Sequence, residues 1–358
     1  MRLAIDTHYF EEGFGGIQSF IEWILGDKIL EEIFKKKDVE KNLFFYNKVL
    51  RFDNSDKKGF PILSKDKTSF YKKAKFFKKI HWFFWFNFIL PSRLKKHKID
   101  IFLSPNHFLP LVKRVKKEVV VIHDFAWRVN PKWKNFGYRI YSRFFQKMSL
   151  NRASKILVIS QNTKNDLQRF YNVPEGKIFL LKPKPLPIFR PREKTNKKLK
   201  EIQKKYKLPE NFILFVGQIE ERKNIDVVLK TINEVVGSGS RGLKLVIVGS
   251  LGFGKKKYLK KIKGNQNIFW FKWVPLEDLA YFYNLAKLFF LPSLYEGLCF
   301  PVLEAINSGI PVIVSNTSSF PEIVGKRGIM LAPYNYRGFC EAIRKLITNS
   351  ERPDARDN

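Results

Sequence analysis

Cysteine and long apolar runs are scarce in this chain of 358 residues. The two cysteines, Cys299 and Cys340, stand outside any CxxC or Cys/His spacing, so neither a disulfide framework nor a zinc site is expected. No stretch of about 18 consecutive apolar residues indicates a transmembrane helix. The N-terminal MRLAIDTHYF also lacks the charged-then-apolar pattern of a secretory signal. These absences predict a protein of the cytoplasm.

Negative charge is the other marked shortage. Asp and Glu number 33 against 67 Lys and Arg, which gives a net charge of +34. Such a surface attracts nucleic acid, anionic lipid head groups or phosphorylated substrates. A basic nucleic-acid-binding protein is therefore one alternative. The lysines are scattered through both halves without a recognisable nucleic-acid-binding module, so no nucleic-acid partner is expected.

Short apolar segments alternate with segments of helical length, which is typical of parallel α/β architecture. The expected strands are 2–6, 42–47, 100–105, 118–124, 155–160, 177–182, 213–217, 243–249, 268–271, 288–292, 311–315 and 328–332. Residues 182–200, rich in Pro and Lys, interrupt the pattern. We predict two Rossmann-like lobes, residues 1–182 and 211–358, joined by a linker over residues 183–210, with the carboxyl ends of both sheets facing a central cleft.

Two motifs of the first half follow predicted strands. GFGGIQSF, residues 13–20, places glycines between a strand and a helix, where the backbone can approach a phosphate or simply turn. VVVIHDFAWRVNP, residues 119–131, ends a buried-looking strand in His123 and Asp124. The carboxyl end of a strand is the functional edge of a parallel sheet, so this pair indicates a site. The alternative is a helix-capping Asp with an incidental His.

The second half contains two further motifs. GQIEERKN places Arg222 and Lys223 before a helix whose expected N-cap is Asn224, a suitable position for a diphosphate or for solvated cations. PSLYEGLCFPVLEAINSGIPVIVSN places Glu296 in a turn, and Glu304 in a helix that should begin at Pro301 and end before the glycine at 309. Two carboxylates at this edge can hold vicinal hydroxyls, although a capping role for the first remains the alternative.

Taken in chain order, these segments resemble the retaining, nucleotide-sugar-dependent glycosyltransferases of family 4, which have the GT-B fold. The resemblance covers most of the chain, from GFGGIQSF through HDFAW, SQNTKNDL and GQIEERKN to YEGLCFPVLEAINSGIPVIVSN and FPEIVGKRG. The segment with two glutamates is its most specific part, because it resembles the E-x7-E motif of the family. The resemblance implies an acceptor-binding first lobe and a donor-binding second lobe.

The resemblance also implies roles for single residues. Glu296 would lie near the transferred sugar and Glu304 on the ribose, and on this interpretation neither glutamate needs a buried cation. Lys223 would neutralise the diphosphate, and His123 would contact the sugar. The expected catalytic residues are thus His123, Lys223 and Glu296. The other implied donor-binding positions are Gly15, Gly16, Arg222, Gly297, Leu298, Cys299 and Phe300, together with Lys223 and Glu304.

Three features depart from the family pattern. Gln218 stands where many members carry Arg, so that one diphosphate cation is missing or is supplied by Arg222. Cys299 stands where glycine is usual, which would crowd the donor pocket. The chain ends at ITNSERPDARDN, so the C-terminal crossover helices are expected to be short or missing.

The implied activity is transfer of a hexose, of mannose or glucose type, from a nucleotide sugar to a hydroxyl of a glycan or lipid-linked acceptor in cell-envelope polysaccharide synthesis. No cofactor or metal is expected, because cations and a helix N-terminus would stabilise the departing diphosphate and no DxD cluster accompanies the motifs. A catalytically impaired sugar-nucleotide-binding protein is a further alternative.

One segment suggests where the acceptor is met. Residues 71–98, YKKAKFFKKIHWFFWFNFILPSRLKKHK, interleave lysines with aromatic residues in the predicted acceptor lobe. They could form an ordinary amphipathic helix with a solvated lysine face, or contact an anionic membrane. Peripheral attachment to the inner face of the plasma membrane is therefore an open expectation beside a purely cytoplasmic location.

Overall fold

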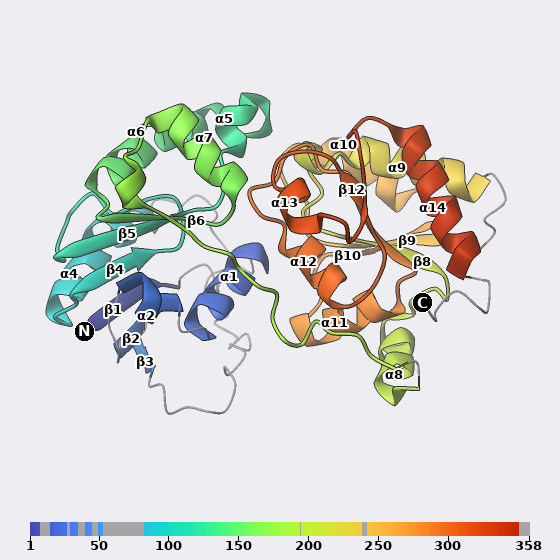
Figure 1. The fold of residues 1–358 in the computed structure, drawn as a ribbon, viewed down its shortest axis with the longest axis horizontal. Coiled ribbons are helices and arrows are strands. Elements are labelled where there is room, and N and C mark those ends of the chain that lie inside the picture. The colour runs from blue at the N-terminus through green and yellow to red at the C-terminus, as the bar shows by residue number, and fades with distance from the viewer. Residues whose placement is uncertain are drawn as a thin grey trace. The chain divides into compact units, whose positions relative to one another are not determined.

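The computed structural model describes residues 1–7, 15–26, 29–34, 40–44, 49–52, 82–193, 195–237 and 242–350. The chain forms two units, each with its own sheet (Figure 1). Unit 1 comprises Met1–Phe125 and Phe136–Pro183, and unit 2 comprises Ala126–Asn135 and Lys184–Asn358. The short segment 126–135 therefore packs with the second half of the chain although it follows a strand of the first.

The described strands of unit 1 form a sheet in the order β3-β2-β1-β4-β5-β6-β7. Their bounds are β1 Arg2–Asp6, β2 Glu40–Phe44, β3 Val49–Phe52, β4 Ile101–Ser104, β5 Lys117–Ile122, β6 Lys155–Val158 and β7 Ile178–Leu180. Neighbouring strands are parallel except for β3, which pairs antiparallel with β2. The predicted segments each overlap a strand here, whereas the edge strand β3 was not predicted.

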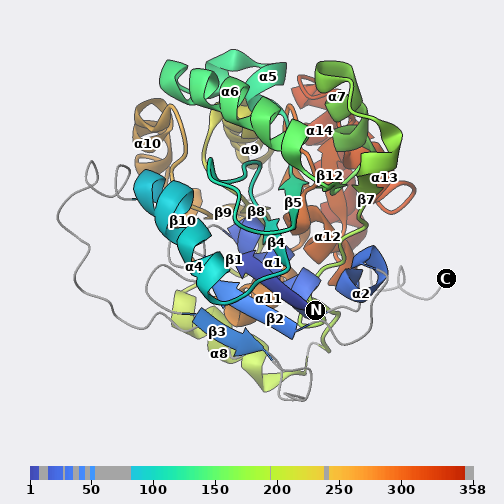
Figure 2. The ribbon, with the colours of Figure 1, turned by 90° about the vertical axis from the view of Figure 1, so that its left-hand side faces the viewer.

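The helices of unit 1 connect these strands. Their bounds are α1 Gly15–Gly26, α2 Ile29–Phe34, the π-helix η3 Trp85–Ile89, α4 Leu90–Lys96, α6 Phe136–Arg152, α7 Gln161–Tyr171 and the 3-10 turn η5 Glu175–Lys177. Apolar side chains of η3, α4, α6 and α7 form one buried cluster with strands β4, β5 and β6. These helices therefore cover one face of the sheet (Figure 1 and Figure 2).

The described strands of unit 2 form a parallel sheet in the order β10-β9-β8-β11-β12-β13. Their bounds are β8 Phe212–Val216, β9 Lys244–Val248, β10 Ile268–Phe271, β11 Leu288–Leu291, β12 Val312–Ser315 and β13 Ile329–Leu331. Each predicted strand of the second half overlaps one of these, which confirms the predicted α/β class of two Rossmann-like sheets. Buried runs of Val, Ile, Leu and Phe explain them, because helices cover both faces of such a sheet.

The helices of unit 2 include one inside the predicted linker. Their bounds are α5 Ala126–Val129, η4 Pro131–Trp133, α8 Lys197–Tyr206, η6 Glu221–Lys223, α9 Ile225–Gly237, α10 Lys255–Lys263, α11 Leu276–Leu285, α12 Phe300–Asn307, α13 Phe320–Val324 and α14 Tyr336–Ser350. Helix α8 buries Leu199 and Ile202, and Tyr206 donates a hydrogen bond to Asp278 of α11 at 2.6 Å. Residues 184–210 are thus part of unit 2 and not a free linker, because the lysine-rich stretch contains the amphipathic helix α8, whose apolar side packs against unit 2.

Helix α12 ends where the sequence predicts. Gly309 has φ +75°, and its N–H donates to Ile306 O while the N–H of Ile310 donates to Ala305 O. These two bonds form a Schellman motif, which needs a residue in the left-handed region and therefore favours glycine. Over the described part of the chain, no helix combines the length and the apolar character needed to cross a membrane.

Candidate functional site

Glu296 lies in the loop between β11 and α12, at the carboxyl end of the unit 2 sheet, and only 4% of it is exposed. Its Oε1 pairs with Lys223 Nζ at 2.7 Å and its Oε2 with Arg222 Nη1 at 2.8 Å. Buried carboxylates need such partners. The prediction that Glu296 needs no buried cation is therefore wrong for this structure, in which the carboxylate holds two cations.

Arg222 connects three acceptors around this carboxylate. Its Nε and Nη2 donate to Glu220 Oε1 at 3.0 and 2.9 Å, and its Nη1 donates to the carbonyl of Tyr295 at 2.8 Å as well as to Glu296. The carbonyl of Arg222 in turn accepts from the N–H of Leu294 at 2.8 Å. Arg222 thus links the turn after β8 to the loop after β11.

Lys223 occupies a space that a glycine leaves open. A Cβ at Gly217, which directly follows β8, would lie 3.2 Å from Lys223 Cε and 3.4 Å from its Nζ. The ammonium group, 6% exposed at the residue level, therefore sits at the carboxyl edge of the sheet and against the backbone. Because an ammonium group has three N–H donors, the pair with Glu296 leaves Lys223 able to contact a ligand as well.

Glu296 is anionic at neutral pH. Burial alone would raise the pKa of its carboxyl group, but the positive charges of Arg222 and Lys223 outweigh burial and hold that pKa below its ordinary value. The backbone N–H of Glu296 also donates to Ser318 Oγ at 2.9 Å. The carboxylate is thus fixed in both charge and position.

Glu304 lies on α12 with 3% of its surface exposed. The hydroxyl of Tyr283, on α11, donates to Glu304 Oε2 at 2.7 Å. Burial, reinforced by the charge of Glu304, holds the pKa of Tyr283 well above its ordinary value, so the hydroxyl remains a donor. The two glutamates thus have different partners: Glu296 is held by cations and Glu304 by a phenol.

Cys299 directs its thiol into the apolar core and is 2% exposed. Burial, reinforced by the charge of Glu296, raises the pKa of this thiol to about 12. The expected crowding of the donor pocket by Cys299 stays a prediction. Gly297 and Leu298 complete the turn, and Cys299 caps α12, whose first residue is Phe300.

Asn224 links three loops of this edge. It has a left-handed backbone with φ +56°, and its Nδ2 donates to the carbonyls of Pro292 and Pro333 at 3.0 and 2.6 Å. Its own carbonyl accepts from the N–H groups of Val227 and Val228, in the first turn of α9. The predicted N-cap therefore begins the helix through its backbone, while its side chain ties loops together.

Segment 126–135 covers the loop that carries Glu296. Ala126, Trp133 and Tyr295 form a small buried cluster, with Leu294 packed against it. The rings of Trp133 and Tyr295 are 6.5 Å apart between centroids. Since Tyr295 directly precedes Glu296, this packing restrains the backbone on which the carboxylate stands.

His123 follows β5 in unit 1, and its tautomer can be read from its contacts. Its Nε2 lies 2.6 Å from the carbonyl oxygen of Pro105, which can only accept, so Nε2 carries the proton and Nδ1 is an acceptor. Burial lowers the pKa of His123, which keeps the ring neutral at neutral pH. Its ring stacks edge-on against Phe20 of α1, at 5.0 Å between centroids. Gly15 and Gly16 are the first two residues of that same helix.

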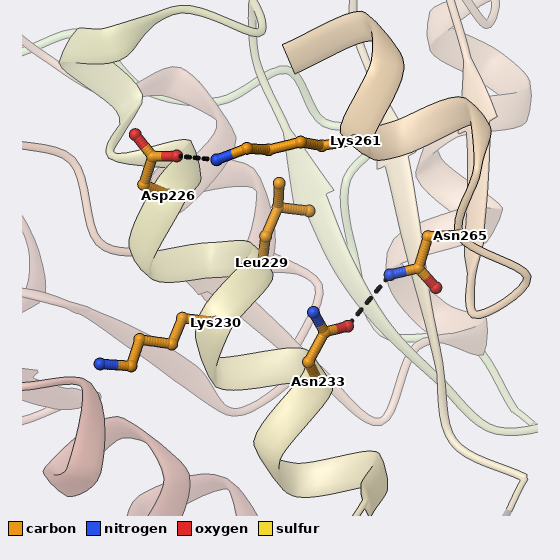
Figure 3. Close-up of a pocket in the computed structure, with 6 residues that line it drawn as sticks. All are labelled: Asp226, Leu229, Lys230, Asn233, Lys261 and Asn265. Carbon is orange, nitrogen blue, oxygen red and sulfur yellow. Dashed lines mark hydrogen bonds and ion pairs between the residues drawn. The ribbon is translucent and has the colours of Figure 1, made fainter. Parts of the chain in front are cut away.

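The sequence interpretation missed the residues that hold the site together: Glu220, Tyr283, Tyr295 and Ser318. Glu220 carried a signal, since it begins the acidic pair directly before Arg222, but Tyr283 and Ser318 come from distant segments. A groove of about 410 Å³ between α9 and α10 contains none of the predicted residues (Figure 3). Its walls are bridged by Lys261 with Asp226 and by Asn265 with Asn233, at 2.9 and 3.0 Å.

Comparison with known proteins gives two family matches. The family model "Glycosyltransferase Family 4" matches residues 64–183, and the model "Glycosyl transferases group 1" matches residues 196–358. O-antigen chain mannosyltransferase B of Escherichia coli is 29% identical over 266 residues, which cover 73% of this chain and 68% of the relative. O-antigen chain mannosyltransferase RfbU of Salmonella typhimurium is 27% identical over 254 residues, 70% of this chain and 65% of that protein. The serotype-specific mannosyltransferase WbdA of Escherichia coli is 26% identical over 240 residues, which span only 29% of its length.

Solved structures show the same fold. WaaG, a glycosyltransferase involved in lipopolysaccharide biosynthesis, aligns over 97% of this chain and 91% of its own with a TM-score of 0.67 and 19% identity. Sucrose-phosphate synthase from Thermosynechococcus elongatus aligns over 97% and 90% with a TM-score of 0.67 and 16% identity. With both halves matched by glycosyltransferase families and the whole by this fold, the chain belongs to the family-4-like glycosyltransferases and has the GT-B fold.

Proposed function

We propose that this glycosyltransferase moves a hexose, of mannose or glucose type, from a nucleotide sugar to a hydroxyl of a glycan or lipid-linked acceptor in cell-envelope polysaccharide synthesis. The relatives named as O-antigen mannosyltransferases support this acceptor class. A protein of the same fold, HepE from Anabaena, has been solved in complex with UDP-glucose at 12% identity and a TM-score of 0.63. The observation that carries the proposal is the buried Lys223–Glu296 pair at the carboxyl edge of unit 2.

Transfer of the hexose requires that the departing nucleoside diphosphate is stabilised. Lys223 lies two residues before the first residue of α9, whose N-terminal N–H groups add positive partial charge, and both favour anionic oxygens at this edge. Charge grows on the diphosphate as the bond to the anomeric carbon breaks, so these contacts strengthen in the transition state. Glu304 is proposed to accept from the ribose hydroxyls. Retention and independence of metal remain predictions.

Glu296 takes a positioning role in this proposal. Its charge holds Lys223 and Arg222 in place before a ligand arrives, and the remaining N–H donors of Lys223 would contact the arriving diphosphate. A contact of Glu296 with the transferred sugar remains compatible with this role, since a carboxylate accepts several hydrogen bonds. His123 is proposed to accept a sugar hydroxyl at Nδ1 and not to act as a cationic group.

We also propose that the chain works in the cytoplasm, in contact with the inner face of the plasma membrane. The support is the lysine-aromatic segment 71–98, of which residues 71–81 lie outside the described residues. In its described part Phe84, Phe88 and Ile89 are 55, 45 and 42% exposed. A lipid-linked acceptor would be presented at that surface.

The test begins with thermal unfolding of the protein in the presence of UDP-, GDP- and ADP-sugars. A donor that binds only the folded chain raises the unfolding temperature, and transfer from that donor to a lipid-linked or glycan acceptor is then followed by mass spectrometry. Donor binding without turnover, with either acceptor, would favour the impaired sugar-nucleotide-binding protein. An unfolding temperature unchanged by every donor, with no transfer, would refute the proposal.

A further inference from the structure

Helix α6 exposes an apolar stripe in addition to its buried face. Phe136, Ile140 and Phe144 recur every four residues and are 68, 56 and 64% exposed. The buried face contains, beside Leu150, two polar residues: Gln146, which accepts from a tyrosine hydroxyl at 3.0 Å, and Ser149, which accepts from a backbone N–H at 2.8 Å. A helix that covers a sheet ordinarily buries its apolar side. An exposed apolar stripe of this kind marks an interaction site.

The stripe continues onto η3 through a chain of ring contacts. Phe144 contacts Phe145 at 5.4 Å between centroids, and Phe145 contacts Phe83 at 6.2 Å. Phe83 contacts Phe84, and Phe84 contacts Phe88, both at 5.9 Å. Three exposed rings from segments that lie far apart in the sequence therefore belong to one continuous surface of unit 1.

Only positive charge accompanies this surface on its own elements. Arg143 and Lys147 are exposed on the same side of α6 as the apolar stripe, because they follow Ile140 and Phe144 by three positions. Lys95 and Lys96 are exposed at the end of α4. Neither α6 nor the stretch from η3 through α4 contains an acidic residue. Aromatic rings mixed with cations, without carboxylates, fit an interface of apolar chains and anionic head groups.

We propose that this surface binds an anionic lipid bilayer. It is called the aromatic-basic face and is defined by six residues: Phe84, Phe88, Ile140, Arg143, Phe144 and Lys147. The rings would enter the interface while the guanidinium and ammonium groups contact phosphates. A nucleic acid would use the cations but leave the aliphatic and aromatic stripe exposed to water, so the bilayer explains both features. The inference deepens the proposed function, because it identifies the surface that would bring the enzyme to a lipid-linked acceptor.

Vesicle sedimentation with the full chain tests this. Vesicles of phosphatidylcholine alone are compared with vesicles of equal parts phosphatidylcholine and phosphatidylglycerol, at low and at physiological salt. The wild type should sediment with the anionic vesicles, less so at the higher salt. Phe144→Ser should weaken binding about tenfold through the lost insertion of one ring, and Arg143→Gln about fivefold through the lost charge. Phe253→Ser, which removes a ring that is 45% exposed in unit 2, is the matched control and should bind like the wild type.

Three results would overturn the proposal: no binding of the wild type to anionic vesicles, equal binding to neutral ones, or wild-type binding by Phe144→Ser. Retained binding of single-stranded DNA by Phe144→Ser, together with unchanged vesicle binding, would mark a general polyanion surface instead. Should Phe144→Ser unfold at a lower temperature than the wild type, the double variant Phe84→Ser, Phe88→Ser gives the same comparison. Donor turnover on a soluble acceptor is measured separately, so vesicle binding without turnover would refute the proposed function and leave the bilayer inference standing.

Discussion

Replacement of Arg222 by methionine separates two roles for this residue. Methionine has a similar reach but neither charge nor N–H donors. If Arg222 is an internal clamp between the turn after β8 and the loop after β11, the variant loses stability. If it is mainly a ligand for the diphosphate, as the sequence suggested, the variant keeps its stability and loses donor affinity.

The structure sets the size of the expected loss. The side chain of Arg222 is 15% exposed, and those of Glu220 and Glu296 are each 6% exposed. Removal of one partner from a buried ion pair costs about 3–5 kcal/mol, because the remaining charges lose their compensation. Lys223 still pairs with Glu296 in the variant, so we expect the lower end, about 3 kcal/mol. For a unit of this size that corresponds to a fall in unfolding temperature of about 6–12 °C.

Thermal unfolding followed by circular dichroism measures this, with Lys198→Met as the control. Lys198 pairs with Glu201 at 2.8 Å, but the two side chains are 51 and 61% exposed, so its loss should leave the unfolding temperature unchanged. An Arg222→Met variant that unfolds with the wild type, while its KM for the donor rises, would refute the clamp and restore the ligand role.

Three further perturbations address the carboxylates and one backbone contact. The folded-state pKa of Glu296 lies below its ordinary value of 4.5. The contribution of this carboxylate to stability is therefore complete above about pH 5 and is lost as the pH falls through the folded pKa. The free energy of urea unfolding of Glu296→Gln should depend less on pH between about 5 and 3 than that of the wild type, and an equal dependence on pH in the two proteins would contradict this. Tyr283→Phe removes the hydroxyl that donates a hydrogen bond to the buried Glu304 and should lower the free energy of urea unfolding by about 1–3 kcal/mol. If Glu304 binds the ribose, the variant should also bind the nucleotide sugar more weakly. An unchanged unfolding midpoint would show that this hydrogen bond contributes nothing to stability. Gly249→Ala would place a Cβ 1.9 Å from the backbone carbonyl oxygen of Gly217 and should lower the free energy of unfolding by at least about 2 kcal/mol. Gly176→Ala is the control and should leave stability unchanged, because a Cβ there meets nothing within 4 Å. Equal stability of the two variants would show that the backbone at Gly217 and Gly249 moves apart at no cost.

The sequence predicted the strands well because a parallel sheet covered on both faces leaves an uninterrupted apolar run at each strand. It missed β3, whose four residues Val49–Phe52 include an arginine and pair at the sheet edge, where such runs are not required. The sequence also predicted a linker where the structure has α8. This helix has five lysines among its ten residues and only two buried apolar residues, Leu199 and Ile202, so its apolar pattern is weak.

The structure brings the predicted residues Glu296, Arg222 and Lys223 into contact, but the sequence did not predict these contacts. Glu296, Glu304 and Lys223 were singled out by their places after strands and in the E-x7-E segment. That Glu296 pairs with residues 73 and 74 positions earlier depends on how β8 and β11 lie side by side in the sheet. Spacing along a chain does not encode such a pairing, so the carboxylate was expected to face hydroxyls only.

The central claim, that the buried pair at the edge of unit 2 serves glycosyl transfer, is tested most directly by the kcat of Lys223→Ala. With the donor identified by thermal unfolding and a glycan acceptor in excess, the variant should lose about 100-fold or more in kcat, as expected when a charge-stabilising group is removed from a transition state. The exposed Lys260→Ala serves as the matched lysine control and should turn over like the wild type. A folded Lys223→Ala with wild-type kcat would contradict the account.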